Sequence, residues 1–546
     1  MNDRRARRLI LAGLAVVAAA GALALGWSTD RGMGLQPDSA FYLDCAAHIG
    51  RGDGYVTGLQ DYLRPISFRD YVADIRAEGR VRPRPVVVFP PFYSFALSAG
   101  RGLGLDPERS ARVLGMILFA VNIFLAGFIV YRYTAPSPGF SFAAAVIMLG
   151  SESTLGLHAY ALSEPLFLAL TLLGLIGLSA FIERGGPWAL AGGSLAAGLA
   201  FLTRYAGGAL VAAGVLAILV FWRASFPKRL AAAGGLALAG GLPVLAFIVR
   251  NLLVAGSATN RTPTIIPVSF AGMILDLKTT LSSWVFPSLY RVLASSSERD
   301  ILAYAAVAVL AGLVAAAVLI VGRARNGGVK AEGAGSARPV LFALFPAVYA
   351  GYILFSMFFI DPEMPLDYRI LAPVFVAGAV AGLIELSRVA RLVRRGALRS
   401  GLALAFGLYL AAYLALGGAW FVRFRSQGGG YNNRQWRGPD MDAAAAAVAL
   451  LPPGLPIVTN DDIAAHFLLG RDAYHIPLGQ WPARIDELRS EIGAGEALAI
   501  LFKTRLQLLR SDTPPDSVER LLAERLSAKP LVRLPSVSVF RIEEAR

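Results

Sequence analysis

The chain has 546 residues, of which 56% are hydrophobic and 16% charged, and its mean hydropathy is +0.57. A soluble domain carries about 25% charged residues, so this composition excludes an ordinary soluble protein and indicates a polytopic membrane protein with a more polar tail. The formal net charge is +15, but many arginines stand in short loops between hydrophobic runs, where they orient helices, so we do not expect nucleic-acid binding. The single cysteine, Cys45, excludes an intramolecular disulfide, and four histidines offer little for a dedicated metal cage.

The N-terminus has the features of a first transmembrane helix. Arginines at positions 4, 5, 7 and 8 precede an apolar run from about Leu9 to Trp27. This run is too long for the hydrophobic region of a typical signal peptide, and no convincing small-residue cleavage site follows it. We therefore predict a membrane-spanning helix whose N-terminus lies in the cytoplasm.

Further apolar runs bring the predicted number of spans to about eleven. Arginine-containing loops between them fall on the cytoplasmic side, as the positive-inside rule requires. The same count places residues 28–108, the turn near 158–164, residues 251–299 and the tail after 423 on the outer face. The later runs lie near 109–131, 139–158, 163–182, 187–204, 206–222, 229–250, 300–322, 338–360, 369–387 and 401–423.

The first outer loop begins with acidic and aromatic residues in a predicted helix that runs to Ile49. Asp38 follows Pro37 and suits an N-cap; it also suits a catalytic base, and the two roles do not exclude each other. Asp44 and His48 are four residues apart and share a helix face, which fits half of a metal site or, more often, a solvated surface pair. Asp38 and Asp44 are six residues apart, so we expect them on different faces.

A second helix is predicted near Ser67–Glu78 in the same loop. Its apolar residues recur at helical spacing and form one stripe, and such a helix suits the membrane interface. Pro90-Pro91 then breaks the chain before a further interfacial segment at 92–103. The stripe consists of Phe68, Tyr71, Val72 and Ile75.

A carboxylate stands at the start of a very apolar helix in the second outer turn. Pro165 suits the first turn of a helix, and Glu164 there complements the helix dipole. These two roles at the start of a helix require no catalytic or binding function of Glu164. Because His158 and Tyr160 lie in the same turn, on the same side of the membrane as Asp38, we favour a functional role for Glu164.

Three arginines are predicted at the outer membrane face. Arg204 lies between two apolar runs, Arg250 ends a helix, and Arg369 begins one. An arginine there snorkels to the surface or pairs with an anion, and a lipid phosphate suits it. Each alone is an ordinary interfacial anchor, but together they suggest a phosphate-binding rim.

The tail, residues 424–546, alternates predicted strands and helices and suggests a small α/β domain outside the membrane. We find no Walker loop and no glycine-rich dinucleotide fingerprint. The predicted helices lie at 440–451 and 463–469, and the predicted strands lie at 455–459, 497–502 and 536–542.

Taken in order, the motifs of this chain resemble those of the GT-C superfamily of glycosyltransferases that use polyprenyl-phosphate sugars. The resemblance is to the bacterial branch with aminoarabinose transferase and the Rgt-type lipopolysaccharide glycosyltransferases, related to protein O-mannosyltransferases. It covers most of the chain and depends on the order and sidedness of the motifs. They are Pro37-Asp38-Ser39 with Tyr42-Leu43, Pro90-Pro91-Phe92-Tyr93, Leu162-Ser163-Glu164-Pro165-Leu166-Phe167, Leu202-Thr203-Arg204-Tyr205-Ala206-Gly207, Arg250-Asn251, Tyr368-Arg369 and Thr459-Asn460-Asp461.

The resemblance implies that a sugar moves from a polyprenyl phosphate in the outer leaflet, usually with inversion. Asp38 matches the acidic residue that activates the acceptor hydroxyl, and Glu164 matches an acidic position in the second outer loop. Arg204 and Arg369 match arginines that hold the donor phosphate. The family often has Asp-Glu where this chain has Asp38-Ser39, which leaves the use of a divalent metal open. Possible accessory residues are Tyr42, Asp44, His48, His158 and Tyr205.

The expected protein is thus an all-α polytopic membrane protein, GT-C-like over residues 1–423, with an extracytoplasmic α/β domain at 424–546. We expect it in the bacterial cytoplasmic membrane, among membrane lipids, with a glycan, lipid or protein as acceptor. One rival is a lipid or glycan transporter, although we find no repeated halves of the kind that transporters show. Another rival is a helical anchor for a partner-binding tail, for which about eleven spans are more than anchoring needs.

Overall fold

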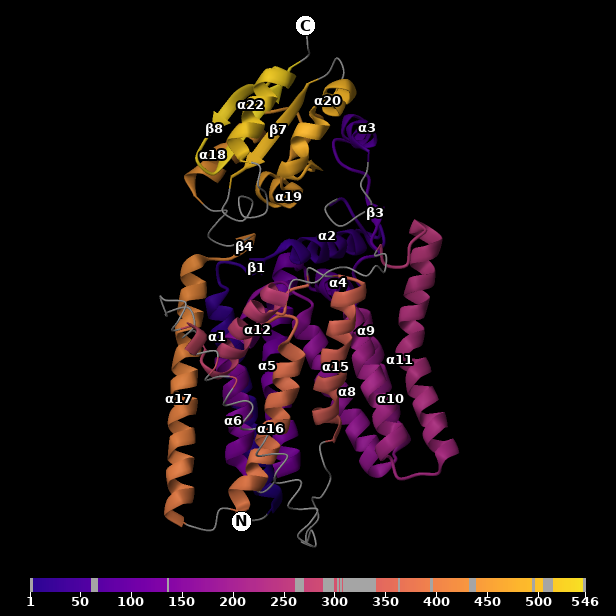
Figure 1. Ribbon diagram of the computed structural model, residues 1–546, viewed down its shortest axis with the longest axis vertical. Coiled ribbons are helices and arrows are strands. Elements are labelled where there is room, and N and C mark those ends of the chain that lie inside the picture. Colours follow the sequence, from indigo (N-terminus) through magenta and orange to yellow (C-terminus); the bar gives the residue numbers. More distant parts are fainter. Residues whose placement is uncertain are drawn as a thin grey trace.

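The computed structural model shows a long helical bundle with an α/β domain at one end (Figure 1). The N-terminus lies near the opposite end of the bundle, and the C-terminus lies in the α/β domain. The structure describes residues 3–59, 67–134, 137–260, 270–287, 299–301, 304, 307, 340–361, 364–392, 396–431, 438–492, 496–503 and 514–543.

Seven helices in the described residues are long and apolar enough to cross a membrane, and an eighth span results if one bent helix pair is counted. The chain is a multi-pass membrane protein. The seven are α1 (Asp3–Ser28), α5 (Pro107–Thr134), α8 (Glu164–Arg184), α11 (Phe226–Ala255), α15 (Val340–Phe359), α16 (Ala372–Leu392) and α17 (Gly396–Gln427). Two shorter apolar helices, α9 (Pro187–Thr203) and α10 (Gly208–Phe221), match two more predicted runs.

The predicted continuous span at 139–158 is broken. It consists of α6 (Pro138–Gly150) and α7 (Glu152–Ala159), which meet at 56°. Ser151 between them has an extended backbone, and the Thr154 hydroxyl donates to the carbonyl oxygens of Met148 and Ser151. These bonds satisfy backbone groups that the break frees.

Two further predictions concern the segment after α11. The predicted span at 300–322 lies almost wholly outside the described residues. The segment 251–299, predicted as an outer loop, contains the helix α12 (Phe270–Val285).

The first outer loop forms a layer between the bundle and the α/β domain. Its helix α2 (Pro37–Arg51) lies across the end of the bundle (Figure 1). Gln36, and not Asp38, is the N-cap of α2, and its backbone N–H donates to the Ser39 hydroxyl over 3.0 Å. Proline occupies the first position of the helix, so Asp38 falls in the first turn rather than at the cap. Two short strands, β2 (Val56–Thr57) and β3 (Arg84–Pro85), and the helices α4 (Phe92–Ser98) and η1 (Ala99–Leu103) complete the layer.

The predicted second helix of this loop forms, but its placement at the membrane interface is wrong. It is α3 (Phe68–Glu78), and its apolar stripe packs into the core of the α/β domain against Trp481. The Tyr71 hydroxyl donates to the Asp472 carbonyl over 3.1 Å and accepts from the Ile457 N–H over 2.8 Å. Figure 1 shows α3 beside the α/β domain, away from the bundle. The stripe is therefore covered by protein.

The tail forms a five-stranded sheet in the order β6-β5-β7-β9-β8, in which β5 pairs in parallel with β6 and β7, and β9 pairs antiparallel with β7 and β8. All five predicted elements of the tail are present; β6, β8 and two helices were not predicted. The strands are β5 (Ile457–Thr459), β6 (Tyr474–His475), β7 (Ala497–Phe502), β8 (Lys529–Arg533) and β9 (Val537–Ile542), and the helices include α18 (Pro439–Ala449), α19 (Asp462–Leu469), α20 (Trp481–Ile492) and α22 (Pro515–Leu526).

Besides the packing of α3, two contacts tie the α/β domain to the first outer loop. Strand β1 (Gly34–Leu35) pairs in parallel with β4 (Gly430–Tyr431) at the point where the tail leaves α17. Asp472 accepts the Val81 N–H over 3.0 Å with one carboxylate oxygen and pairs with His466 over 3.1 Å with the other. The loop and the domain are thus joined by the backbone pairing of β1 with β4 and by the hydrogen bond from the Val81 N–H to Asp472, a carboxylate that His466 also holds.

The His466–Asp472 pair makes stability depend on pH. Burial lowers the pKa of His466, but the hydrogen bond to Asp472 and the negative charge of Asp44 outweigh burial and raise that pKa above its usual value. Protonated His466 therefore stabilises the folded protein. Its contribution is fully present below the unfolded-state pKa of about 6.5 and is lost as the pH rises through the folded-state pKa.

We predict that His466→Gln lowers the melting temperature most near pH 6, and that its deficit relative to wild type shrinks toward about pH 8.5. Thermal unfolding of the full chain in detergent micelles across this range measures the difference. Asp472→Asn serves as the comparison, because it should remove the part of the pH dependence that the hydrogen bond and charge of Asp472 supply. A deficit that stays constant or grows with pH would contradict the assignment.

Candidate active site

Helix α2 brings Asp38 to the end of the bundle. Pro37 at the first helical position fixes the direction of the first turn, and Asp38 follows it. The Asp38 side chain is 23% exposed, and its Oδ2 accepts a hydrogen bond from Arg369 Nη2 over 2.6 Å. Asp38 Oδ1 makes no hydrogen bond with the residues that the structure describes. One carboxylate oxygen is therefore held, and the other is open.

The guanidinium of Arg369 holds three acceptors at once. Its Nη2 and Nε donate to Glu164 Oε1 over 2.9 and 3.1 Å, and its Nη1 donates to Gln36 Oε1 over 2.7 Å. Arg369 lies in the turn before α16, where Asp367 Oδ1 accepts the backbone N–H groups of Arg369 and Ile370. The turn therefore fixes the backbone from which the guanidinium reaches α2 and α8.

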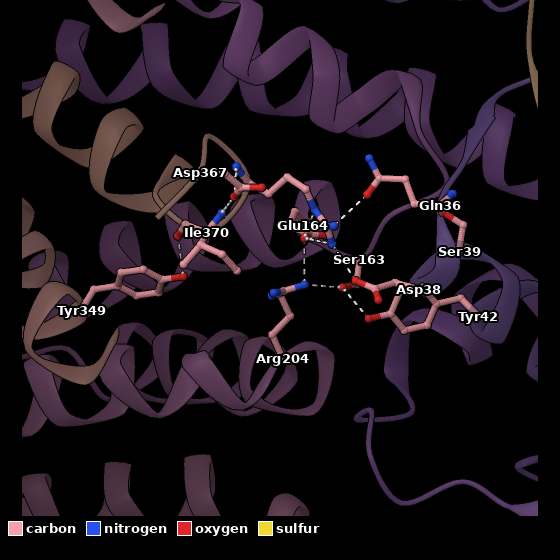
Figure 2. Close-up of polar contacts among 11 residues, drawn as sticks. Gln36, Asp38, Ser39, Tyr42, Ser163, Glu164, Arg204, Tyr349, Asp367 and Ile370 are labelled. Carbon is pink, nitrogen blue, oxygen red and sulfur yellow. Dashed lines mark hydrogen bonds and ion pairs between the residues drawn. The ribbon is translucent and has the colours of Figure 1, made fainter. Parts of the chain in front are cut away.

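Glu164 joins this arginine to a second one. Arg204, in extended backbone just after α9, approaches Glu164 Oε1 to 3.0 Å with Nη1, which also donates to the Ser163 hydroxyl over 3.1 Å. The Ser163 and Tyr42 hydroxyls lie 3.1 Å apart. Figure 2 shows Asp38, Ser163 and Glu164 side by side, with Arg204 pointing toward them. We call Asp38, Glu164, Arg204 and Arg369 the charge cluster.

The charge cluster is balanced and largely buried. Two carboxylates face two guanidinium groups, and the side chains of Glu164, Arg369 and Arg204 are 5, 18 and 19% exposed. Burial raises the pKa of Tyr42, so its phenol stays protonated beside Ser163. Glu164 Oε2 is buried and has no hydrogen-bond partner among the described residues. The cluster thus leaves one buried carboxylate oxygen, and the Nε and Nη2 of Arg204, without hydrogen-bond partners among the described residues.

Two of the predicted accessory residues, Asp44 and His48, lie outside the charge cluster. Asp44 Oδ2 accepts from the Thr57 hydroxyl and the Gly58 N–H over 2.5 and 2.9 Å, and His48 lies 2.8 Å from Asp53, so this pair faces away from Asp38. Both side chains are less than 10% exposed, so the expectation of a solvated surface pair is wrong.

His158 and Tyr205 also make contacts outside the charge cluster. His158 is fully buried, and its Nε2 lies 2.9 Å from the Asn122 side-chain nitrogen. The Tyr205 hydroxyl donates to the Val87 carbonyl over 3.2 Å.

Arg250 does not join the charge cluster. Its Nη1 donates to the Val86 carbonyl over 2.9 Å, and its Nη2 donates to the Tyr55 carbonyl over 3.1 Å. These bonds hold the β2–β3 region of the first outer loop against α11. Of the three predicted arginines, the structure brings Arg204 and Arg369 together.

Sequence reasoning missed the neutral residues that orient the charges. Gln36 binds Arg369, and Tyr349 donates its hydroxyl to the Ile370 carbonyl over 3.0 Å, next to the Arg369 turn. Gln36 carries no charge and precedes a proline, so nothing in the sequence pattern indicated that it belongs to the site. Among the described residues, no group of three or more His, Cys, Asp or Glu side chains is arranged to hold a metal ion.

We predict that Arg369→Gln destabilises the protein by about 3–5 kcal/mol, because it leaves two partly buried carboxylates without their shared partner. Combining it with Asp38→Asn should recover part of the loss. Thermal unfolding in detergent measures both. Arg388→Gln, which breaks an i,i+3 pair with Glu385 on the same helix α16, is the matched control and should cost about 1 kcal/mol or less. Equal losses for the two arginines would refute the special role of Arg369.

The sequence matches no protein-family model and no curated protein. Its fold is similar to solved structures. The structure of ArnT from Cupriavidus metallidurans bound to undecaprenyl phosphate has a TM-score of 0.56 and 15% identity, over 97% of this chain and 99% of that one. The arabinofuranosyltransferase AftD from Mycobacteria has a TM-score of 0.52 and 16% identity, over 97% of this chain but only 40% of AftD.

Both similar structures are GT-C enzymes: ArnT is an aminoarabinose transferase, and AftD transfers arabinofuranose. The similarity extends over nearly the whole of this chain, from the bundle through the C-terminal sheet. The resemblance that the motifs suggested is therefore confirmed at the level of the fold. The chain has the fold of the GT-C membrane glycosyltransferases.

Proposed function

We propose that this protein is a membrane glycosyltransferase that moves a sugar from a polyprenyl-phosphate-linked donor to an acceptor hydroxyl at the outer face of the bacterial cytoplasmic membrane. The observation that carries the proposal is the charge cluster, in which a half-open carboxylate and two arginines meet at one end of the bundle. The fold shared with ArnT, which binds undecaprenyl phosphate, supports a donor of this kind.

The general base is Asp38. In the proposed reaction, the acceptor oxygen attacks the anomeric carbon, the bond from that carbon to the phosphate oxygen breaks, and the phosphate keeps the electron pair. The acceptor proton passes to the Asp38 carboxylate, whose Oδ1 is the open atom. A base within hydrogen-bond reach of the attacking hydroxyl is sufficient for this step, and attack opposite the leaving group inverts the anomeric centre.

The leaving phosphate is stabilised by arginine. Arg204 is anchored through Nη1 alone, and its Nε and Nη2 make no hydrogen bond with the described residues. These donors suit a phosphate oxygen, and fixed guanidinium charges stabilise the negative charge that develops there. Arg369 lies on the other side of Glu164, and its three nitrogens already donate to Glu164, Gln36 and Asp38. Arg250 is not part of this phosphate site, because carbonyl groups occupy its guanidinium.

Glu164 has a positioning role in this proposal. It is buried between two arginines that would otherwise repel each other and turn toward water. Its Oε1 accepts hydrogen bonds from Arg369 and forms an ion pair with Arg204 Nη1, which fixes the two guanidinium groups at a shared point. The free Oε2 is an acceptor for a hydroxyl of the bound sugar.

We predict that Asp38→Asn lowers the rate of sugar transfer about 10²- to 10⁴-fold, because the amide cannot take the acceptor proton. Transfer from a pool of polyprenyl-phosphate sugars is measured in membranes that express equal amounts of each variant. Asp30→Asn is the matched control: Asp30 lies in the same outer loop and pairs with Arg425, so transfer should be unchanged. Undiminished transfer by Asp38→Asn would rule out the base, and no transfer by wild type would favour a transporter.

We predict that Arg204→Gln raises the donor KM, or lowers kcat/KM for the donor, about tenfold or more, because a charge-assisted hydrogen bond to phosphate is lost. Arg250→Gln provides the comparison and should leave the donor KM near the wild-type value once activity is normalised to folded protein. The measurement is initial transfer rate against donor concentration. A larger rise in donor KM for Arg250→Gln than for Arg204→Gln would place the phosphate site at Arg250 instead of Arg204.

A further inference from the structure

A polar cavity lies against a face of α2 that does not carry Asp38. Its volume is about 540 Å³, and its walls come from α2, the segment 80–83, the start of α5 and the α19 region of the C-terminal domain. In Figure 1, α2 and α19 face each other between the bundle and the sheet. The volume is within the range of sites for small organic ligands. Neither the charge cluster nor the proposed transfer step uses this cavity.

The wall on the α2 side is a fixed polar surface. Asp44 Oδ2 is held by Thr57 and Gly58, and His48 is held at Nδ1 by Asp53. The remaining atoms of this pair, Asp44 Oδ1 and His48 Nε2, lie 3.7 Å apart, which is too far for a hydrogen bond between them. Both residues line the cavity. An acceptor and an imidazole nitrogen are thus presented to it from one helix face.

The opposite wall belongs to the C-terminal domain. Asp472 is fixed by the Val81 N–H and by His466, and Phe467 adds an aromatic ring. The negative charge of Asp44 acts on His466 across the cavity. Because residues of both walls line one cavity, the cavity exists only when the domain is docked on the first outer loop.

Four exposed charged residues also line the cavity, and two of them, Arg51 and Asp106, pair with Asp53 and Arg109. Arg80 and Glu108 line the cavity, and neither makes a hydrogen bond or ion pair with the described residues. The Arg80 guanidinium can only donate hydrogen bonds, and the ionised Glu108 carboxylate can only accept them. Their side chains are thus available to a ligand that both donates and accepts hydrogen bonds.

The lining selects for a hydroxyl-rich ligand of low charge. Four carboxylates, two arginines and two histidines line the cavity, so a phosphate meets more negative than positive charge when the histidines are neutral. A lipid chain is disfavoured because it would strip water from these charges. Sugar hydroxyls donate to carboxylates and accept from guanidinium and imidazole groups, and the C–H faces of a sugar ring pack against Phe467 and the neighbouring proline side chains.

We propose that this cavity binds a neutral oligosaccharide, the part of a glycan acceptor that lies beyond the reacting hydroxyl. Its role as an acceptor site rests on the proposed function. Asp44 follows Asp38 by six residues on the same helix, an axial rise of about 9 Å, and a glycan that reaches both the base and the cavity must pass around α2. An acceptor of this class is a saccharide chain rather than a simple lipid alcohol or a protein side chain.

The test is binding of maltotriose, cellotriose and xylotriose to the full chain in detergent micelles, measured by ligand-observed NMR, with inorganic phosphate as the comparison ligand. At least one trisaccharide should bind, and Arg80→Gln and Glu108→Gln should each weaken it about tenfold, because each removes a hydrogen bond to a charged group. Both side chains are exposed, so the fold should persist. Arg69→Gln, an exposed arginine on α3 outside the cavity, is the matched control.

The binding assay involves no transfer step, so it separates this proposal from the proposed function. Asp38→Asn should bind the trisaccharide as wild type does while losing transfer. Binding of none of the three trisaccharides overturns the proposal. So does binding that is equal in wild type, Arg80→Gln and Glu108→Gln, or binding of phosphate in their place.

Discussion

The ion pairs of Arg369 are the interaction on which the outer end of the bundle depends. One guanidinium binds Asp38, 331 residues before it, and Glu164, 205 residues before it. It thereby joins the first outer loop, the start of α8 and the turn before α16. In a largely buried setting such charges persist only when each has a partner. The geometry of the candidate site is therefore a condition of the fold, and the chain cannot rearrange one without disturbing the other.

Helix α2 divides the outer layer into two polar environments. Asp38 faces the bundle, and Asp44 and His48 face the C-terminal domain. The six-residue spacing turns the two aspartates to different faces of one helix. Because both faces are covered, small rotations of α2 would disturb both environments together. This coupling explains why so much of the layer, from β1 to the Val81–Asp472 contact, serves to hold α2 in place.

The charge cluster was largely predictable from the sequence, because each member interrupts an apolar pattern. Asp38 follows the first hydrophobic run, Glu164 and Arg369 stand where runs begin, and Arg204 stands where one ends; the sidedness of the loops placed them at one face of the membrane. Arg250 has the same local signal but binds backbone carbonyls. Periodicity identifies a buried or interfacial face without naming what covers it, so α3 was predicted correctly as a helix and wrongly as interfacial. Gln36 and the break at Ser151 depend on tertiary contacts that no local pattern reports.

Under the proposed function, the two arginines are not equivalent toward an incoming phosphate. Arg369 already donates through all three of its nitrogens to Gln36, Asp38 and Glu164, whereas Arg204 is held through Nη1 and keeps two nitrogens open. A phosphate oxygen therefore meets Arg204 without displacing a carboxylate, and it reaches Arg369 only by competing with one. Glu164 binds both arginines, whereas Asp38 binds only Arg369. A phosphate that competes for Arg369 therefore disturbs the charge cluster least when it displaces Asp38. Donor binding and release of the Asp38 carboxylate are in this way linked through a single guanidinium.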